Sequence, residues 1–250
     1  MRGKTVRKLS AWLFGAALIA LWEIAAVSVD RVYLLPGPAD VIRSLLLNRK
    51  EIFLVHLPAT MEVVAVGGAL SILVGALFAV MMDLFGPVRK ALYPLLTLSQ
   101  AIPVMCLAPV FVLWFGYTTA MRVVVVILTN FFPVTINLYD GLRSARPERM
   151  ELMKTWGATK GQIFRLLRFP SSLPYLFTAL RIAVPWSVIA AAVAEWLGAP
   201  AGLGFYSRYC MRDMDAPGLL APLLVLTVIA LLLNGILKVL ERRIVSWRGQ

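Results

Sequence analysis

Charged residues are scarce in this chain and unevenly spread along it. Asp, Glu, Lys and Arg make up 15% of the 250 residues, while hydrophobic residues make up 60%. About a quarter of an ordinary soluble protein is charged, so this chain has too little charge to cover the surface of a water-soluble domain. Three stretches, 63–82, 91–121 and 216–237, contain no charged residue. Because a bilayer-spanning helix needs about 20 mainly apolar residues, the sequence predicts an all-α polytopic integral membrane protein.

Residue types that commonly carry chemistry are also few. The chain has two cysteines, Cys106 and Cys210, and a single histidine, His56, which we expect at the outer membrane interface. So few ligands exclude a disulfide framework and a metal cluster. The sequence contains no Gly-x-x-x-x-Gly-Lys-Ser/Thr motif for nucleotide phosphates. We therefore predict a chain that is not an enzyme and has no catalytic site, cofactor or metal of its own.

The apolar stretches predict one domain, 1–250, with about six spans. The expected bounds are 9–29, 60–82, 91–115, 120–139, 176–197 and 217–240. The basic segment Arg2 to Lys8 before the first span would also fit a signal peptide. However, the apolar run continues to Val29, includes Glu23 and is followed by no clear cleavage site. We therefore interpret it as an uncleaved first span.

The distribution of Lys and Arg indicates the orientation of the spans. With the N-terminus inside, the inner segments hold more than twice as many Lys and Arg residues as the outer ones. This asymmetry predicts that both termini lie in the cytoplasm. The net charge of +12 would also suit nucleic-acid binding. The basic residues lie between apolar spans, however, so we expect membrane lipid and no nucleic acid around this chain.

Candidate residues for a translocation pathway lie inside the spans. Pro103 and Pro109 interrupt the third span, and transporters build pathways where membrane helices are broken. Such breaks also occur in lipid-facing helices, so a pathway role for Gln100 to Pro103 is one of two interpretations. Asn130 joins this candidate set. Glu195 is a candidate for the pathway wall, and the alternative is a solvated residue at a helix end.

The segment between the fourth and fifth spans, residues 143–170, is polar, basic and patterned. Helix-like periodicity begins near Glu148, stops at Gly157-Ala158-Thr159, resumes at Gln162 and is expected to end at Pro170. This pattern predicts two short helices joined at a glycine, with one apolar face. Such an element docks in a groove on a partner. The alternative is a basic loop that lies on anionic lipid.

Three residues of this segment have a physical reason for their type. A carboxylate such as Glu151 near a helix N-terminus is favoured by the helix dipole, by about 0.3–1 kcal/mol. Gly157 permits a turn that other residues adopt only with strain. Pro170 is expected to end the helix before the chain re-enters the bilayer.

The same segment resembles a loop of ATP-binding-cassette (ABC) importer permeases. In that family the last large cytoplasmic loop carries Glu-Ala-Ala, three residues, Gly, nine residues and Ile-x-Leu-Pro. This chain matches the register at Glu151, Gly157 and Pro170, while Leu152 and Met153 replace the two alanines. The resemblance implies that the ATPase-coupling residues are Glu151, Leu152, Met153, Gly157, Ala158 and Pro170.

Motifs elsewhere in the chain resemble the nitrate, sulfonate and taurine branch of these type I permeases. They include 34–38 (Leu-Leu-Pro-Gly-Pro), 114–116 (Trp-Phe-Gly) and 195–198 (Glu-Trp-Leu-Gly). Within that branch, 93–96, Ser99-Gln100, 140–144 and Glu62 resemble permeases for pyrimidine precursors of thiamine such as hydroxymethylpyrimidine. The substrate expected from this resemblance is a thiamine precursor, and the alternatives are a sulfonate, taurine or nitrate.

The resemblance also implies an assembly and a location. Two cytoplasmic ABC ATPase subunits would bind ATP and Mg and dock on two permease copies, expected to be a homodimer because each chain has one docking loop. An external substrate-binding protein would deliver the solute to the permease, which would carry it across the bacterial inner membrane. From the residues alone, a secondary transporter or a non-transporting membrane scaffold also remains open.

Overall fold

The computed structural model describes residues 2–245, without the side chains of 2–12, Met105 and Ala108. The regular secondary structure within that range is helical. Four continuous helical segments are long and apolar enough to cross a membrane, namely 49–84, 119–143, 160–198 and 216–244. They comprise α3 (Arg49–Glu51), η1 (Ile52–His56) and α4 (Leu57–Leu84); α7 (Thr119–Arg143); α9 (Lys160–Ile163), η2 (Phe164–Arg168) and α10 (Phe169–Gly198); and α12 (Ala216–Ile244). The all-α prediction is confirmed over the described residues.

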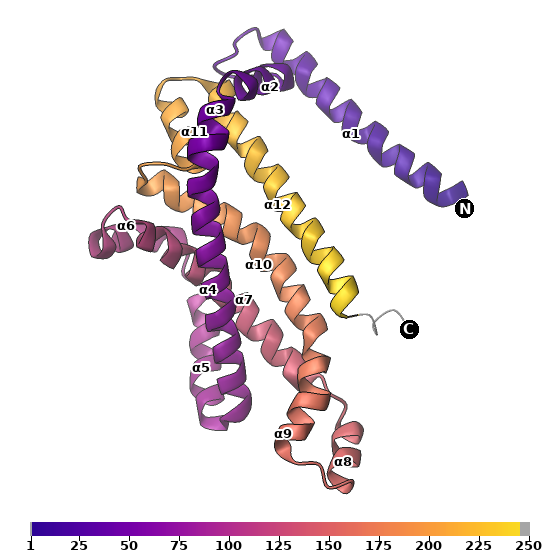
Figure 1. Cartoon of the computed structure of the whole chain (residues 1–250). Coiled ribbons are helices and arrows are strands. Elements are labelled where there is room, and N and C mark those ends of the chain that lie inside the picture. The colour runs from indigo at the N-terminus through magenta and orange to yellow at the C-terminus, as the bar shows by residue number, and fades with distance from the viewer. Residues whose placement is uncertain (1, 246–250) are drawn as a thin grey trace.

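The third predicted span forms two helices instead of one. α5 (Gly86–Ser99) and α6 (Val104–Phe115) are separated by residues 100–103, and each is shorter than a membrane-spanning helix. Pro103 lies just before α6 with an extended ψ of 113°, and a proline disfavours helical backbone in the residue that precedes it. In Figure 1, α5 lies beside the lower half of α4, and α6 leads away from it. Cys106 is exposed on α6.

The first helix stands apart from the others. α1 (Arg2–Val29) leans away from the bundle and meets it at the start of α2 (Pro38–Leu47) (Figure 1). There the Glu23 carboxylate accepts a 3.2 Å hydrogen bond from the Ala39 amide, in the first turn of α2. Many of the apolar side chains of α1, such as Phe14 and Leu21, are exposed. In turn, α2 packs on α12.

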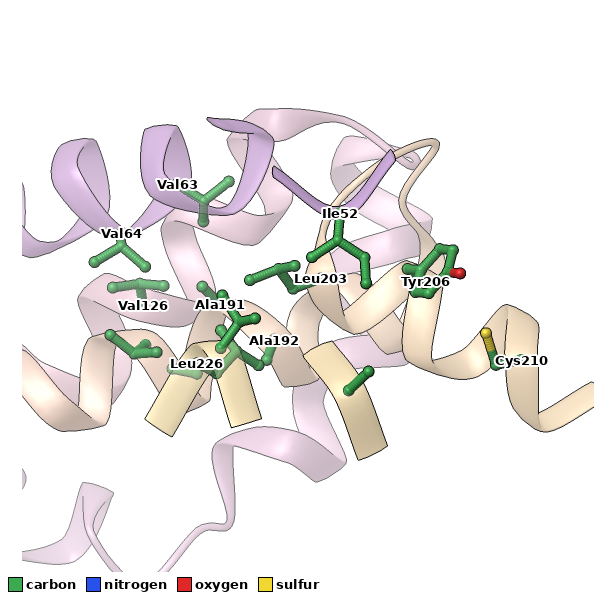
Figure 2. Close-up of a cluster of buried hydrophobic side chains, with 14 of the residues drawn as sticks. Ile52, Val63, Val64, Val126, Ala191, Ala192, Leu203, Tyr206, Cys210 and Leu226 are labelled. Atoms are coloured by element: carbon green, nitrogen blue, oxygen red, sulfur yellow. The ribbon is translucent and has the colours of Figure 1, made fainter. Parts of the chain in front are cut away.

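The main core lies at the end of the bundle opposite α8 (Pro147–Thr155). Figure 2 shows apolar side chains from α4, α7, α10, α12 and the short helix α11 (Leu203–Arg212) meeting there. The helices approach closely where a glycine of α4 faces a valine of α7. A Cβ atom at Gly67 would lie 2.7 Å from the Cβ of Val126, so only glycine allows α4 and α7 this contact. Sequence periodicity did not predict α11, in which Cys210 is buried.

Two π-helical turns lie where prolines enter long helices. In η1 and η2 the amides of Leu57 and Phe169 donate to the carbonyls five residues earlier, and the next residues are Pro58 and Pro170. Proline lacks an amide hydrogen and its ring clashes with the carbonyl four residues before it. The wider turn accommodates the ring. The prediction that Pro170 ends a helix is therefore wrong, since 160–198 is continuous.

Candidate functional site

The segment between α7 and α10 contains two short helices, as predicted. α8 ends in a Schellman motif, in which the Gly157 amide donates to the Lys154 carbonyl (2.9 Å) and the Ala158 amide to the Met153 carbonyl (3.0 Å). Gly157 has a φ of +78°, in the left-handed region that favours glycine. The predicted glycine turn is therefore present. We call residues 147–168 (α8, α9 and η2) the loop element.

The second helix of the loop element begins with a capping box that sequence reasoning missed. The Gln162 amide donates to the Thr159 hydroxyl (3.3 Å), and the Gln162 side-chain oxygen accepts from the Thr159 amide (2.8 Å). This reciprocal pair satisfies two amides at the start of α9. The spacing Thr-x-x-Gln in the sequence was the available signal. Both ends of the turn around Gly157 are therefore fixed by local hydrogen bonds.

Glu151 does not occupy the position that its predicted stabilisation requires. Pro147 begins α8, so the acidic residue in the first turn is Glu148, and Glu151 lies in the second turn. Because the dipole effect falls off within the first turn, it applies to Glu148. Glu151 is exposed instead, like its neighbour Leu152.

Large apolar side chains of the loop element are exposed. Trp156 is 77% exposed and Leu166 65% exposed, and Leu152 is about half exposed at 49%. Met153 and Ala158 are half-buried. Exposed apolar groups on a segment outside the bundle indicate a surface that another molecule covers. The exposed apolar side chains are thus consistent with the prediction that the loop element docks on a partner.

Arg168 joins the loop element to the ends of two long helices. Its guanidinium forms an ion pair with Asp83, near the end of α4, and its Nε donates a 3.1 Å hydrogen bond to the Leu142 carbonyl, near the end of α7. The Asp83 side chain is 2% exposed, and a carboxylate near a helix C-terminus is disfavoured by the dipole. Arg168 therefore compensates a buried charge and ties three elements together. No local sequence pattern marks this pair, because its two residues lie 85 positions apart.

The pathway candidates of the third span line a cavity. Gln100 and Pro103, at the break between α5 and α6, face α7 and α10 across a cavity of about 520 Å³. Thr129 of α7 and the half-exposed Trp186 of α10 also line it. None of the described residues that line this cavity is charged. Trp186 was missed because an isolated tryptophan in an apolar span carries no distinctive pattern.

Asn130 lies outside that cavity. Its side chain is fully buried, and its amide nitrogen donates to the Ser187 hydroxyl of α10 (2.8 Å) and to the Val126 carbonyl (3.1 Å). Its side-chain oxygen has no hydrogen-bond partner among the described residues. In this structure Asn130 therefore holds α7 against α10.

Glu195 is also fully buried rather than solvated at a helix end. One carboxylate oxygen accepts from the Gly204 amide (2.8 Å) and the Thr60 hydroxyl (3.1 Å). Thr60 in turn accepts from the Leu203 amide (2.8 Å). These bonds fix the turn between α10 and α11 on the start of α4. Glu195 does not line the cavity that contains Gln100 and Pro103.

His56 belongs to the same buried cluster, so the chain itself covers this residue. The side chain is 4% exposed, and its Nδ1 accepts a 3.2 Å hydrogen bond from the Gly202 amide. The His56 ring lies next to the aromatic rings of Phe205 and Tyr206 of α11. The location of His56 depends on a contact with a residue 146 positions later, which local sequence does not reveal.

The chain matches a known protein family over most of its length. The model of the "binding-protein-dependent transport system inner membrane component" family matches residues 71–246. The chain is 45% identical over 245 residues to the formylaminopyrimidine transport permease protein ThiX of Halalkalibacterium halodurans, covering 98% of each chain. It is 28% identical to the taurine transport system permease protein TauC of Escherichia coli, covering 97% of this chain and 90% of the relative.

A solved structure shares the fold. The crystal structure of an amino acid ABC transporter with histidines has a TM-score of 0.68 and 16% sequence identity, and the match covers 79% of this chain and 96% of that chain. The fold is that of an ABC importer transmembrane domain, which confirms the all-α membrane architecture. The chain belongs to the inner membrane components of binding-protein-dependent transport systems and is the permease of a type I ABC importer.

Proposed function

We propose that this permease imports a pyrimidine precursor of thiamine, in the class of formylaminopyrimidine or hydroxymethylpyrimidine. The observation that carries the proposal is the 45% identity to a formylaminopyrimidine permease over 98% of both chains. The similarity to a taurine permease is lower, at 28%. A sulfonate, taurine or nitrate importer is the alternative.

The cavity at the helix break supports an uncharged substrate. Gln100 and Thr129 offer hydrogen-bonding groups, and Trp186 offers an aromatic face, which together suit a flat heterocycle. A sulfonate or nitrate anion would need a cationic partner away from bulk water, and the described lining residues supply none. We therefore propose this cavity as part of the translocation pathway, with Gln100 and Pro103 in its wall.

The loop element is the proposed docking site of the ATPases. Two cytoplasmic ABC ATPase subunits, which bind ATP and Mg, would each contact the exposed face that includes Leu152 and Trp156. This arrangement requires two permease copies, which we propose to be a homodimer, and an external binding protein that delivers the substrate. It also requires the loop element, both termini and the ends of α4 and α7 to face the cytoplasm of a bacterial cell.

The proposed mechanism is alternating access. Closure of the ATPase dimer on ATP would move the two loop elements, and Arg168 would transmit that motion to Asp83 on α4 and to the end of α7. Because α7 and α10 line the cavity, a shift of these helices would change its access. Such a scheme needs two states of the assembly whose equilibrium ATP biases.

The test is uptake by proteoliposomes that contain the permease, the ATPase and the binding protein. We expect ATP-dependent uptake of labelled formylaminopyrimidine or hydroxymethylpyrimidine that competes poorly with taurine and nitrate. Preferred uptake of taurine or nitrate would overturn the substrate assignment. Calorimetry on the isolated binding protein gives an independent measurement of the same preference.

Variants in the same assay test the cavity. Trp186→Ala is expected to raise the KM for the heterocycle about tenfold, since base–aromatic stacking contributes about 1–3 kcal/mol. Trp114→Ala is the matched control, because Trp114 is exposed on α6 and does not line the cavity. Equal effects of the two substitutions would argue against a substrate contact at Trp186.

A further inference from the structure

A basic pocket lies at the same end of the bundle as the loop element, on a part of the chain to which transport assigns no role. It is a cavity of about 360 Å³ lined by Arg89, Lys90, Tyr93 and Pro94 of α5 and by Tyr139 of α7. Tyr139 is 5% exposed and belongs to the apolar cluster that joins the ends of α4, α5 and α7. The pocket therefore has a rigid wall and a cationic rim.

Two arginines converge on the hydroxyl of Tyr139. Arg89 donates a 3.3 Å hydrogen bond to this oxygen, and Arg143 donates one of 2.9 Å and lies over the Tyr139 ring at 5.7 Å from its centroid. The two guanidinium groups share this one oxygen, so two like charges lie close together and repel one another. With both lone pairs accepting, the hydroxyl proton of Tyr139 is available to a further acceptor.

The basic pocket has an excess of positive charge. Arg89, Lys90 and Arg143 form no ion pair among the described residues. Asp140, the next residue on α7, interacts electrostatically with Arg143, and Asp83 is paired with Arg168. Three cations and one carboxylate leave a net charge that an anion with several acceptor oxygens would balance. A phosphodiester has that chemistry.

The surroundings of the basic pocket identify the source of the phosphodiester. Tyr93 at its rim is 44% exposed, and tyrosines are typical of the membrane interface. Further along α5, away from the charged end, Leu95 and Leu98 are 60% and 65% exposed. Leu98 follows Pro94 of the pocket by four residues and so lies on the adjoining side of α5, where an acyl chain can lie while its headgroup enters the pocket. Basic pockets at the cytoplasmic side of membrane helices bind anionic lipid headgroups in this way.

We propose that the basic pocket is a binding site for one anionic phospholipid of the cytoplasmic leaflet. The headgroup phosphate accepts from Arg89, Lys90 and the Tyr139 hydroxyl, and one acyl chain packs on the outer face of α5. Because Tyr139 lies one helical turn before the end of α7, the lipid stabilises the same end of α7 that Arg168 contacts. The proposal rests on the orientation given under the proposed function.

Native mass spectrometry of the permease–ATPase complex tests this site. The complex is released from nanodiscs of mixed phosphatidylcholine and phosphatidylglycerol, and the phosphatidylglycerol retained per permease is counted. We expect enrichment of phosphatidylglycerol on the unaltered complex and about a fivefold loss in Lys90→Gln, since one basic residue near the surface contributes about 1 kcal/mol. Tyr139→Phe keeps the buried ring and is expected to lower retention as well.

Lys238→Gln is the matched control, because Lys238 is an exposed lysine near the same end of the bundle, on α12 outside the pocket. It should retain phosphatidylglycerol like the unaltered complex. An equal loss in Lys238→Gln, or no enrichment on the unaltered complex, would overturn the proposal.

Two further results would identify a different occupant of the pocket. Displacement of the lipid by millimolar inorganic phosphate would identify a free-anion site. Retention by the isolated permease but not by the complex would show that a protein partner covers the pocket. Either outcome would overturn the lipid assignment.

The lipid count is independent of the transported solute. A wrong substrate assignment would appear in the uptake assay and leave phosphatidylglycerol retention unchanged. Failure of the lipid site would leave uptake selectivity unchanged. The two proposals can therefore fail separately.

Discussion

At the scale of single residues, Glu195 shows how a carboxylate is accommodated inside this bundle. It accepts hydrogen bonds from a backbone amide and a hydroxyl on two other elements, and its second oxygen has no partner among the described residues. A Cβ atom at Gly202 would lie 2.2 Å from the Glu195 carboxyl carbon, so the turn closes directly on the side chain. The contacts assign Glu195 a structural task at the end of the bundle opposite the loop element.

This task predicts a stability effect. Glu195→Ala leaves the buried Gly204 amide unsatisfied and opens a cavity, so we expect a loss of about 2–4 kcal/mol in the free energy of unfolding. Glu195→Gln keeps one acceptor oxygen and should lose less. Thermal unfolding of the purified permease in detergent measures both, with Glu62→Ala, at an exposed carboxylate of α4, as the control. Normal stability with abolished uptake would instead favour a role of Glu195 in the pathway wall.

At the scale of elements, the loop element has a single turn between two helices. Local hydrogen bonds fix the C-terminus of α8 and the N-terminus of α9, and Gly157 between them has left-handed backbone. An L-residue at Gly157 would meet no neighbouring atoms, so the cost of replacement is backbone strain alone. Gly161, four residues later in α9, also has open space around its Cβ position but has helical backbone. The two glycines therefore have the same free space around them and differ only in backbone conformation.

We expect Gly157→Ala to weaken ATPase docking and uptake about fivefold to thirtyfold, because left-handed backbone costs a non-glycine residue about 1–2 kcal/mol. Gly161→Ala should have no such effect, since alanine favours a helix by about 1 kcal/mol over glycine. Co-purification of the ATPase and uptake in proteoliposomes are the measurements. Full coupling in a folded Gly157→Ala complex, and in Gly157→Trp, would show that the loop element is not the coupling element.

Hydropathy and local spacing anticipated some of these elements and missed others for physical reasons. The long apolar helices, the break near Pro103 and the turn at Gly157 depend on neighbouring residues, so the sequence revealed them. The bond between Thr60 and Glu195 joins residues 135 positions apart, and the pairing of Asp83 with Arg168 joins residues 85 positions apart. Such contacts exist only after helices pack. The prediction at Pro170 was wrong because a π turn accommodates its ring.

At the scale of the whole molecule, Arg168 and Asp83 connect the loop element to the helices around the cavity. α4 packs along α7, and α7 along α10, so one ion pair links the exposed loop to the largest contacts in the bundle. A second ion pair, Arg181 with Glu241, joins α10 to α12. Motion of the loop element would therefore reach α4 through the Arg168–Asp83 pair, and α10 directly through the continuous 160–198 helix.

We expect Asp83→Asn and Arg168→Gln each to lower the uptake per ATP hydrolysed while the ATPase still docks. Removing one partner of a buried pair costs about 3–5 kcal/mol, and the 23% exposure of Arg168 places this pair toward the lower value. The double variant should be less impaired than the sum of the two single variants. Additive losses would show that the two side chains act independently, and unchanged coupling would remove Arg168 from the transmission route.

The π turn at 164–168 has a consequence for the rotational phase of the continuous 160–198 helix. An α-helix turns about 100° per residue, and a π turn holds one residue more than an α turn. Because the wider turn absorbs that extra residue, deleting one residue from Phe164–Arg168 would restore α geometry and leave α9 in nearly the same rotational phase relative to the bundle. Deleting one residue from the α-helical part of 169–198 would instead rotate the loop element by about 100° relative to the rest of that helix.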